Sequence, residues 1–308
     1  MEEVEAVSAA TSPSAGRCYG VRRVCETWQI SRSTFYDWRQ RRSSTRSLGK
    51  RGPKTEFSDS ELADEIRVVL ADSEQVHGFR GEGHRKAWAR LRFRGMRTSQ
   101  RRVLRIMREQ GLLAAHRPGT PRGPRVHNGR IITDRPDEMW GTDATQIWTL
   151  EDGYVWVFAA IDHCTGEIVG THASTKGNRF EALIPVQDGV REYFGGLESK
   201  IAEGLSVRHD HGSQFMSRHY QQELRFLGIK SSPSFVRTPE GNGVAERLMR
   251  TIKEQVLWIE TYRTAEDVRQ ALRDFRARYN ESWIIARHGY LSPAGARRRH
   301  EERALMVG

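Results

Sequence analysis

Length, composition and charge already restrict what this chain can be. It has 308 residues, a formal net charge of +11 at pH 7 and a pI of about 9.9, which allows one core of about 150 residues with smaller helical modules. It shows neither an apolar run of about 18 residues nor a charged-then-apolar leader, which argues against a membrane span and against export. Its three cysteines, Cys18, Cys25 and Cys164, have no paired spacing. This argues against a disulfide framework and favours a reducing, cytoplasmic compartment.

The positive charge is concentrated in the first part of the chain. Residues 1–130 contain 27 Lys and Arg against 14 Asp and Glu, whereas residues 131–308 contain 23 against 25. A surplus of this kind, carried more by Arg than by Lys, favours a nucleic-acid partner, because neutralised phosphates release their counterions. The alternative is solubility charge on a protein without such a partner.

Residues 1–16 are small and acidic to neutral, and we expect them to form a disordered tail. Residues 17–42 then predict a compact helix-turn-helix or, as the alternative, a small helical packing unit. Ser31 is the expected N-cap of the second helix, and Phe35 and Trp38 should face inward. The side chains expected to face DNA are Arg32, Thr34, Arg39 and Arg41.

Residues 57–117 predict a second helical module, which is an equally good candidate for DNA contacts. A turn at Arg94 and Gly95 would join two of its helices. Arg102 and Arg105 are the side chains expected to contact DNA there. The stretches that flank this module are rich in Arg, Gly, Ser and Pro and are expected to be flexible linkers: residues 43–56 and 118–133.

Residues 134–262 predict the main domain, which begins with a β-hairpin. The runs 139–150 and 154–161 predict two strands joined by an Asp-Gly turn. The second strand is apolar throughout, as expected for a central strand that is buried on both faces. Asp143 would lie on the strand beside it. The remaining residues, 263–308, are expected to form a C-terminal helical extension.

Two further acids lie at the ends of predicted elements. Asp210 ends a short strand and is followed by a helix over residues 217–227. Glu246 lies near the start of a helix over residues 243–259. The apolar face of that helix consists of Val244, Leu248, Ile252, Val256 and Ile259.

Arg250 and Lys253 share the helix face of Glu246, because they follow it by four and seven residues. This arrangement suits a carboxylate that holds a metal ion while two cations contact the phosphates of DNA. The alternative is a solvated helix face with an ion pair between Glu246 and Arg250.

Asp143, Asp210 and Glu246 would converge from two strands and a helix. Unit charges about 4 Å apart interact by roughly 4 kcal/mol at an effective dielectric near 20, so such a cluster needs cations. Oxygen ligands without an organised set of Cys or His favour Mg²⁺ or Mn²⁺ over zinc, and no Cys-x-x-Cys follows His77 and His84. Two ions about 3.5 to 4 Å apart could activate an attacking oxygen and neutralise a leaving oxygen.

Several motifs occur in the order and spacing of one family. Asp210 and Glu246 have 35 residues between them, as in retroviral integrases and many bacterial transposases. The other matching segments are His77-Gly78-Phe79-Arg80, Asp137 to Asp143, His209 to Phe215, Tyr279-Asn280 and Leu291-Ser292-Pro293. Over most of its length the chain resembles the second-frame (OrfB) DDE transposases of the insertion-sequence family numbered three.

The resemblance implies a ribonuclease-H-like integrase core, that is, a mixed five-stranded sheet with helices on both sides, preceded by all-α DNA-binding modules. It implies that Asp143, Asp210 and Glu246 are catalytic ligands of Mg²⁺, with Mn²⁺ as a substitute. Lys253 would contact the DNA end, and Asn242 would lie beside the active site and also contact DNA. The implied activity is cleavage at insertion-sequence ends and strand transfer by direct transesterification.

The resemblance also implies partners. These are the terminal repeats and the target DNA, further copies of the chain on paired ends, and a first-frame (OrfA) product that is fused or made separately, in the bacterial cytoplasm at the nucleoid. The competing function is a non-enzymatic DNA-binding regulator derived from a transposase, which the intact acids disfavour. A ribonuclease H is a third possibility, and the basic N-terminal modules argue against it.

The sequence departs from the family at His209, where Ser is usual, and at residues 281–288, which replace an Arg-Pro-His cluster. His209 and His211 could be metal ligands or a proton relay, or they could position the loop around Asp210. Asp162, at the end of the central strand, is the one rival acid, and the turn that follows it offers a structural explanation.

Overall fold

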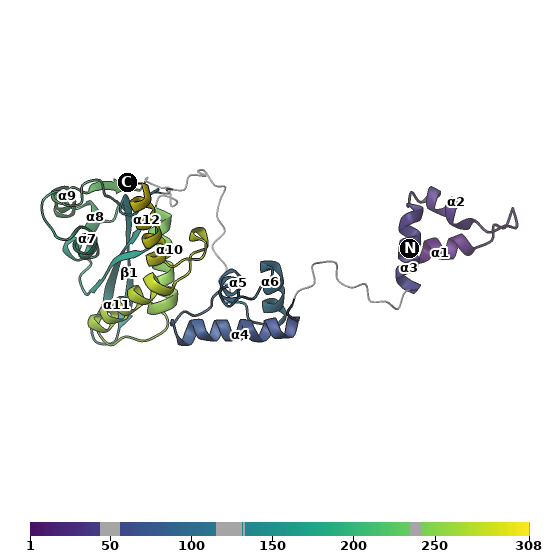
Figure 1. Cartoon of the computed structure of the whole chain (residues 1–308), viewed down its shortest axis with the longest axis horizontal. Helices are drawn as coiled ribbons and strands as arrows, with labels where there is room; N and C mark the ends of the chain where they lie inside the picture. Colours follow the sequence, from purple (N-terminus) through teal and green to yellow (C-terminus); the bar gives the residue numbers. More distant parts are fainter. Residues whose placement is uncertain (44–55, 115–130, 132, 235–241, 308) are drawn as a thin grey trace. The chain divides into compact units, whose positions relative to one another are not determined.

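The structure is a computed structural model, and it describes residues 1–43, 56–114, 131, 133–234 and 242–307 (Figure 1). The chain divides into two compact units, Met1–Lys54 and Thr55–Gly308. The first unit is built from helices, and the second contains a helical module and a sheet with its covering helices. The predicted linkers, 43–56 and 118–133, lie almost entirely outside the described residues.

Residues 1–16 do not form a disordered tail, contrary to the prediction. Helix α1 (Glu2–Ala9) packs against α2 (Gly20–Thr27) through an apolar stripe that includes Val4 and Val7. Because these two valines are three positions apart, they lie on the same helix face. The acidic composition of the segment conceals this stripe, and full burial of a valine, worth about 1.5 to 3 kcal/mol, favours the ordered helix.

The second helix of the predicted helix-turn-helix is α3 (Arg32–Ser43). Phe35 is fully buried, and Trp38 is half-buried on the same cluster, so both face inward as predicted. Ser31, the predicted N-cap, lies with its Oγ 2.5 Å from the Oγ of Ser33. The first unit therefore has a small apolar core of its own.

The helical module of the second unit consists of α4 (Asp59–Gln75), α5 (His84–Phe93) and α6 (Gln100–Glu109). Ser58 and Ser99 cap α4 and α6, because each side chain accepts a hydrogen bond from the third backbone N–H that follows it. The buried side chains between the three helices include Leu62, Ile66, Leu91, Val103, Ile106 and Met107. The module thus has a core separate from that of the sheet.

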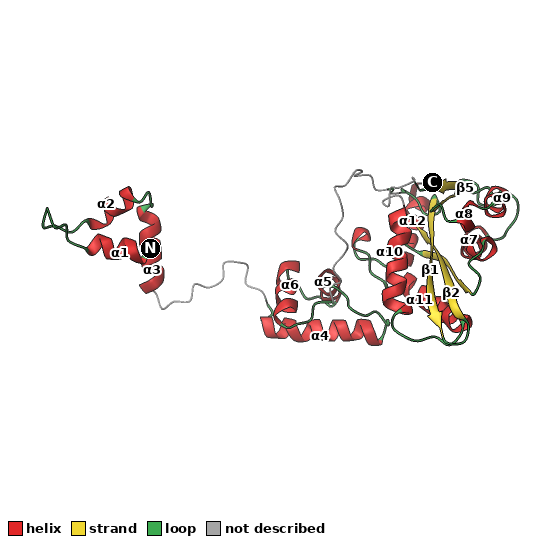
Figure 2. Ribbon diagram, turned by 180° about the vertical axis from the view of Figure 1, so that it is seen from behind, coloured by secondary structure: helices red, strands yellow, loops and turns green. Residues whose placement is uncertain are grey.

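One sheet holds five strands in the order β3-β2-β1-β4-β5 (Figure 2). The strands are β1 (Met139–Thr149), β2 (Gly153–Asp162), β3 (Ile168–Ser174), β4 (Ser206–His209) and β5 (Lys230–Pro233). β2 is antiparallel to β1 and to β3, whereas β4 is parallel to β1 and to β5. This mixed sheet confirms the predicted fold class.

Helices cover both faces of the sheet (Figures 1 and 2). One face carries α7 (Arg179–Phe194), α8 (Ser213–Met216) and α9 (Arg218–Phe226), and the other carries α10 (Gly243–Ile252) and α11 (Ala265–Ser282). Successive residues of β2 alternate between them, since Val157 packs with the α10 face and Phe158 with the α7 face. β2 is therefore buried on both faces, as its apolar sequence predicted.

The predicted helix over residues 243–259 changes its type partway. The α-helix ends at Ile252, and Lys253–Leu257 forms a π-helical turn. A π-turn holds more residues per turn than an α-helix, so Val256 and Leu257 both reach the core, at 4% and 3% exposure. Helical periodicity placed only the first of these two on the apolar face, and a continuous α-helix was the wrong prediction there.

Residues 263–308 are largely helical, as predicted, and their first helix, α11, covers the sheet. Val268 and Phe275 of α11 are fully buried in the cluster on the α10 face of the sheet. A short 3₁₀ turn (Ala286–His288) and helix α12 (Pro293–Val307) follow. The boundary after residue 262 therefore separates a covering helix from the sheet that it covers.

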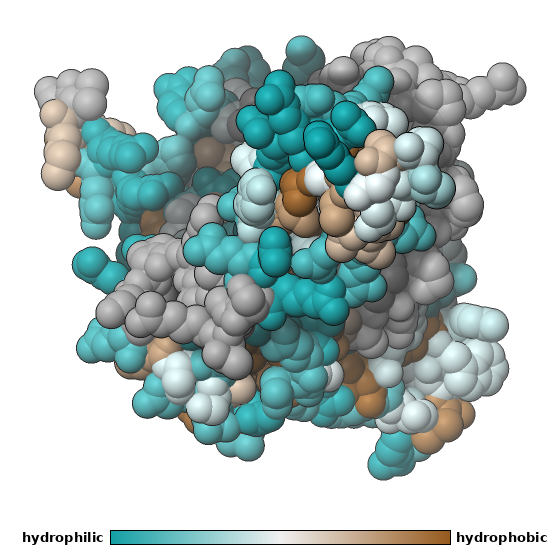
Figure 3. Space-filling model, turned by 90° about the vertical axis from the view of Figure 1, so that its right-hand side faces the viewer, coloured by the Kyte–Doolittle hydropathy of each residue, from teal (hydrophilic) through white to brown (hydrophobic). Residues whose placement is uncertain are grey.

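The face of the molecule in Figure 3 is mostly hydrophilic, with apolar residues in small separate patches. Elsewhere, Trp148 and Tyr154 at the tip of the β1–β2 hairpin are exposed and contact each other, with ring centroids 4.9 Å apart. Within the described part of the chain, no helix has the length and apolar character that crossing a membrane requires.

Candidate active site

Asp143 lies on β1, in the part of the sheet that α10 covers. Its Oδ1 accepts a hydrogen bond of 2.8 Å from the backbone N–H of Ala144. Burial, together with the negative charges of Asp210 and Glu246, raises the pKa of Asp143 to about 6. The positive charge of Lys253 acts in the opposite direction on that pKa. Charged groups from separate elements therefore act on one another across one site.

Asp210 directly follows β4, which runs parallel to β1. Its Oδ1 accepts a hydrogen bond of 2.8 Å from the N–H of Gly212, which fixes the turn. The buried His209 lies with Nδ1 2.6 Å from the carbonyl oxygen of Asp210 and Nε2 2.9 Å from the Oγ of Ser231 on β5. Burial lowers the pKa of His209. Both ring nitrogens are engaged, which supports the loop-positioning role over a proton relay.

Asn242 connects the helix of Glu246 to the strand of Asp143. It immediately precedes α10, and its Nδ2 donates a hydrogen bond of 3.0 Å to the carbonyl of Thr142. At 4% exposure its side chain is inside the protein, so the expectation that Asn242 contacts DNA is replaced by a positioning role. Glu246 follows on the exposed side of the first turn of α10.

The two cations on the helix face of Glu246 have different surroundings. Lys253 is half-buried at the start of the π-helical turn, and its charge lowers the pKa of Asp143. Arg250 is exposed and forms an ion pair with Glu254, with 3.0 Å between Nε and Oε1. An exposed pair of this spacing is worth about 0.3 to 0.5 kcal/mol, so Arg250 could exchange it for a phosphate at little cost.

Among the residues that the structure describes, no three His, Cys, Asp or Glu side chains are gathered tightly enough to hold a metal ion. Asp143, Asp210 and Glu246 therefore do not form a closed ligand set in the structure, although the charges of Asp210 and Glu246 act on Asp143. Their oxygen donors nevertheless fit a hard divalent cation. A bound cation would offset the repulsion that raises the pKa of Asp143.

The rival acid, Asp162, has a structural role. It is fully buried at the end of β2 and accepts hydrogen bonds from the backbone N–H groups of Asp137 (2.9 Å) and Thr165 (2.7 Å) and from the hydroxyl of Thr165 (2.9 Å). Burial raises the pKa of Asp162. Its oxygens fix the turn between β2 and β3, which is the explanation that the sequence offered.

The arginines of the helical module divide into paired and unpaired groups. Arg102 and Arg105, the predicted DNA contacts, both form ion pairs with Asp59, at 2.7 and 2.6 Å. The exposed arginines that form no ion pair with any described residue include Arg85, Arg97, Arg101 and Arg108. Sequence reasoning missed this second group, although the seven-residue spacing of Arg101 and Arg108 places them on one helix face.

The predicted DNA contacts of the first unit divide in the same way. Arg39 lies 3.5 Å from Glu5 of α1. Arg32, Thr34 and Arg41 are exposed, and neither Arg32 nor Arg41 has an ion-pair partner in the described part of the chain. Helix α3 therefore carries two arginines, Arg32 and Arg41, that form no ion pair with a described residue.

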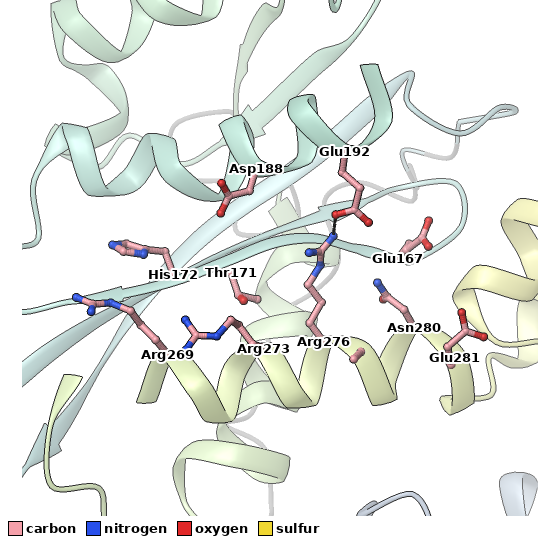
Figure 4. A pocket seen from close by; sticks show the side chains of 11 residues that line it. Glu167, Thr171, His172, Asp188, Glu192, Arg269, Arg273, Arg276, Asn280 and Glu281 are labelled. Carbon is pink, nitrogen blue, oxygen red and sulfur yellow. Dashed lines mark hydrogen bonds and ion pairs between the residues drawn. The ribbon is translucent and has the colours of Figure 1, made fainter. Parts of the chain in front are cut away.

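A groove of about 610 Å³ lies away from the acids, between β3, α7 and α11 (Figure 4). Its arginines bind the outer edge of the sheet: Arg276 donates to the carbonyl of Ile168 at 2.8 Å, and Arg269 donates to that of Ala173 at 2.6 Å. Asn280 pairs with both the N–H and the carbonyl of Ile168, at 2.9 and 3.0 Å. These contacts satisfy an edge strand that would otherwise be open to pairing.

Comparison with known proteins identifies an integrase core domain in this chain. Two family models, both described as integrase core domain, match residues 133–239 and 227–293. The chain is 27% identical over 288 residues to the transposase for insertion sequence element IS629 of Shigella sonnei, which covers 90% of this chain and 91% of that protein. It is 29% identical over 295 residues to an uncharacterized 48.2 kDa protein of insertion element IS2A from Escherichia coli. The aligned region covers 92% of this chain and 66% of that protein. The solved catalytic core domain of BIV integrase is similar over 55% of this chain and 99% of that one, with a TM-score of 0.40 and 16% identity.

A mixed five-stranded sheet with acids on β1, after β4 and on α10 defines an integrase core, the domain of a polynucleotidyl transferase. The two family matches run from residue 133 to residue 293, and the relatives extend the similarity to both helical parts of the chain. The chain belongs to the insertion-sequence transposases with an integrase core domain, as its motifs indicated.

Proposed function

We propose that Asp143, Asp210 and Glu246 are the catalytic acids of this transposase and that together they bind the metal. The observation that carries the proposal is the placement of the three acids on β1, directly after the parallel strand β4 and in the first turn of α10, which Asn242 ties to β1. The raised pKa of Asp143, caused by burial and then by the charges of the other two acids, supports it. An integrase core depends on a divalent metal, and we propose two Mg²⁺ ions, with Mn²⁺ as a substitute.

The proposed reaction has two steps of one type. In the first step water attacks the phosphodiester at the insertion-sequence end, and the bond that breaks frees a 3′-hydroxyl. In the second step that hydroxyl attacks a phosphodiester of the target DNA and displaces the 3′-oxygen of the target strand. Cations bound by the acids would promote the attack and neutralise charge on the leaving oxygen. The chain's own residues hold the geometry: His209 fixes the turn of Asp210, Asn242 ties α10 to β1, and Lys253 contacts a phosphate of the DNA end.

DNA would be bound mainly through the helical parts of the chain. The arginines without ion-pair partners among the described residues are the proposed phosphate contacts, because a paired arginine must first lose its protein partner. The ligands would be the terminal repeats of the element and the target DNA. We also propose that the chain acts as a multimer on paired ends, with a first-frame product as a partner.

The test is single-turnover cleavage and joining with the inverted repeats that flank the gene, in Mg²⁺ and in Mn²⁺. Asp143→Asn, Asp210→Asn and Glu246→Gln should each abolish both steps and leave end binding close to that of the unmodified chain. The matched control is Asp188→Asn, an acid of α7 that pairs with Arg191, and it should retain activity. Strand transfer at the normal rate by any of the three variants would remove that residue from the proposed site.

A further inference from the structure

The connection between α4 and α5 inserts into the sheet domain instead of facing solvent. Phe79 is 1% exposed and belongs to the apolar cluster that α10 and α11 form with the sheet. Its ring packs edge-on against that of Trp283, with centroids 5.0 Å apart. Burial of a phenylalanine side chain is worth about 1.5 to 3 kcal/mol, so this contact holds the helical module firmly against the integrase core.

The next residue forms a two-point hydrogen bond with the active-site helix. The backbone N–H of Arg80 donates to Oε1 of Gln255, and its carbonyl accepts from Nε2 of the same side chain, both at 2.9 Å. Gln255 lies within the π-helical turn, two residues after Lys253. The helical module is therefore attached to the turn that begins with Lys253.

Further contacts hold α5 and α6 near the same place. Nζ of Lys86 lies 2.9 Å from the centroid of the Trp283 ring, and Trp88 packs edge-on against Tyr290, with centroids 5.6 Å apart. Gln100 at the start of α6 donates a hydrogen bond of 3.2 Å to the hydroxyl of Tyr290. Both helices thus have a defined position relative to the core.

We propose that Phe79 and Arg80 clamp the helical module to the π-helical turn, and that Gln255 is a positioning residue for Lys253. This inference rests on the proposed function, in which Lys253 contacts the DNA end. The clamp places DNA that is held by the module at a fixed distance from Glu246. It therefore acts on the orientation of the reacting phosphate and not on affinity, which the arginines provide.

The test uses the full chain with Gln255→Leu, a substitution that keeps a helix-compatible side chain of similar length and removes both hydrogen bonds. The matched control is Gln270→Leu on α11, because Gln270 is exposed and, among the described residues, bonds only to Arg273 and Asp274 of its own helix. Gln255→Leu should lower the joining rate at saturating DNA by about 5- to 100-fold, as expected for a displacement of about 1 Å. The DNA concentration at half-saturation and the melting temperature should stay unchanged, and the control should join at the normal rate.

Gln255→Glu provides a conservative comparison, since its carboxylate still accepts from the N–H of Arg80 and should recover part of the rate. A normal saturating rate in Gln255→Leu, or an equal loss in Gln270→Leu, would overturn the clamp. The clamp would also be overturned if the joining rate of Gln255→Leu fell together with its melting temperature and its half-saturating DNA concentration changed by the same factor. That result would show a structural contact without a positioning role.

A second measurement does not depend on catalysis. Hydrogen exchange of peptides that contain Arg80 and the turn Lys253–Leu257 should accelerate in Gln255→Leu and stay unchanged in Gln270→Leu, because the Arg80 amide loses its acceptor. Unchanged exchange in both variants would refute the clamp whatever the activity shows. If the unmodified chain joined no DNA while exchange responded as expected, the proposed function would fail and the clamp would remain as a structural contact.

Discussion

Two aspartates on neighbouring strands show how similar burial leads to different roles. Asp143 on β1 and Asp162 at the end of β2 both have a raised pKa for which burial is the largest cause. Asp162 is surrounded by three protein donors, whereas Asp143 accepts one hydrogen bond, from Ala144, and is next to two other negative charges. A buried acid that accepts hydrogen bonds from protein donors stabilises the fold. The ionised form of a buried acid that lies beside other acids is destabilised until a cation binds.

The largest expected effect tests the functional side of this comparison. Asp143→Asn should reduce joining below detection while the melting temperature of the metal-free chain stays equal or rises, because the substitution removes a repelled charge. Single-turnover joining and a melting curve on the same preparation would measure both. Loss of activity together with a large loss of stability would mean that Asp143 supports the fold, as Asp162 does.

The structural side of the comparison is tested by Asp162→Ala. The substitution leaves the N–H groups of Asp137 and Thr165 without their acceptor, so we expect a loss of about 3 kcal/mol in the free energy of unfolding. Denaturant unfolding would measure it. Joining by the fraction that remains folded should proceed at the normal rate, and a catalytic defect without a stability defect would reverse the two assignments.

Lys253→Ala examines the cation that faces Asp143. It should weaken joining at limiting DNA by about 1.5 to 3 kcal/mol, the value of one charge-assisted contact, while stability changes by only a few tenths of a kcal/mol. Arg250→Ala is the comparison, because Arg250 already pairs with Glu254. Equal joining by Lys253→Ala and the unmodified chain at every DNA concentration would leave Lys253 as a solvated helix residue.

The raised pKa of Asp143 also predicts a pH dependence of stability. The folded-state pKa of about 6 lies above the ordinary value of 3.8, so folding favours the protonated form. The contribution of Asp143 to the free energy of unfolding is therefore fully present below about pH 4, and about 3 kcal/mol of it is lost as the pH rises through 6. Unfolding with a chelator present should show this loss in the unmodified chain and a smaller one in Asp143→Asn; identical pH profiles would contradict the raised pKa.

The smallest effects are expected for the arginines of the helical module, where Arg102, which pairs with Asp59, is compared with Arg101 and Arg108, which form no ion pair with a described residue. Joint replacement of Arg101 and Arg108 by Ala should lower the slope of log affinity against log salt by about 2, one for each lost phosphate contact, and leave stability almost unchanged. Arg102→Ala should instead lower stability, because Asp59 loses a partner. The reverse pattern in salt titrations and melting curves would restore Arg102 as a DNA contact.

The sequence by itself determined the fold class and the positions of the candidate acids. The apolar run of β2, the Asp-Gly hairpin and the helical periodicity after residue 243 are local patterns, and local patterns decide where strands and helices form. The spacing of Asp143, Asp210 and Glu246 then identified the family, because each acid occurs at a defined place within such an element.

Tertiary structure decided which polar side chains remain for DNA and which are used within the protein. Arg102 pairs with Asp59, Asn242 bonds to Thr142, and Phe79 reaches the cluster around α10, each through a partner distant in the sequence. The formation of helix α1 and the formation of the π-helical turn also depend on apolar surfaces that other segments of the chain supply. Periodicity and spacing describe one segment at a time, so they do not contain the distance between two segments, and only the folded chain fixes that distance.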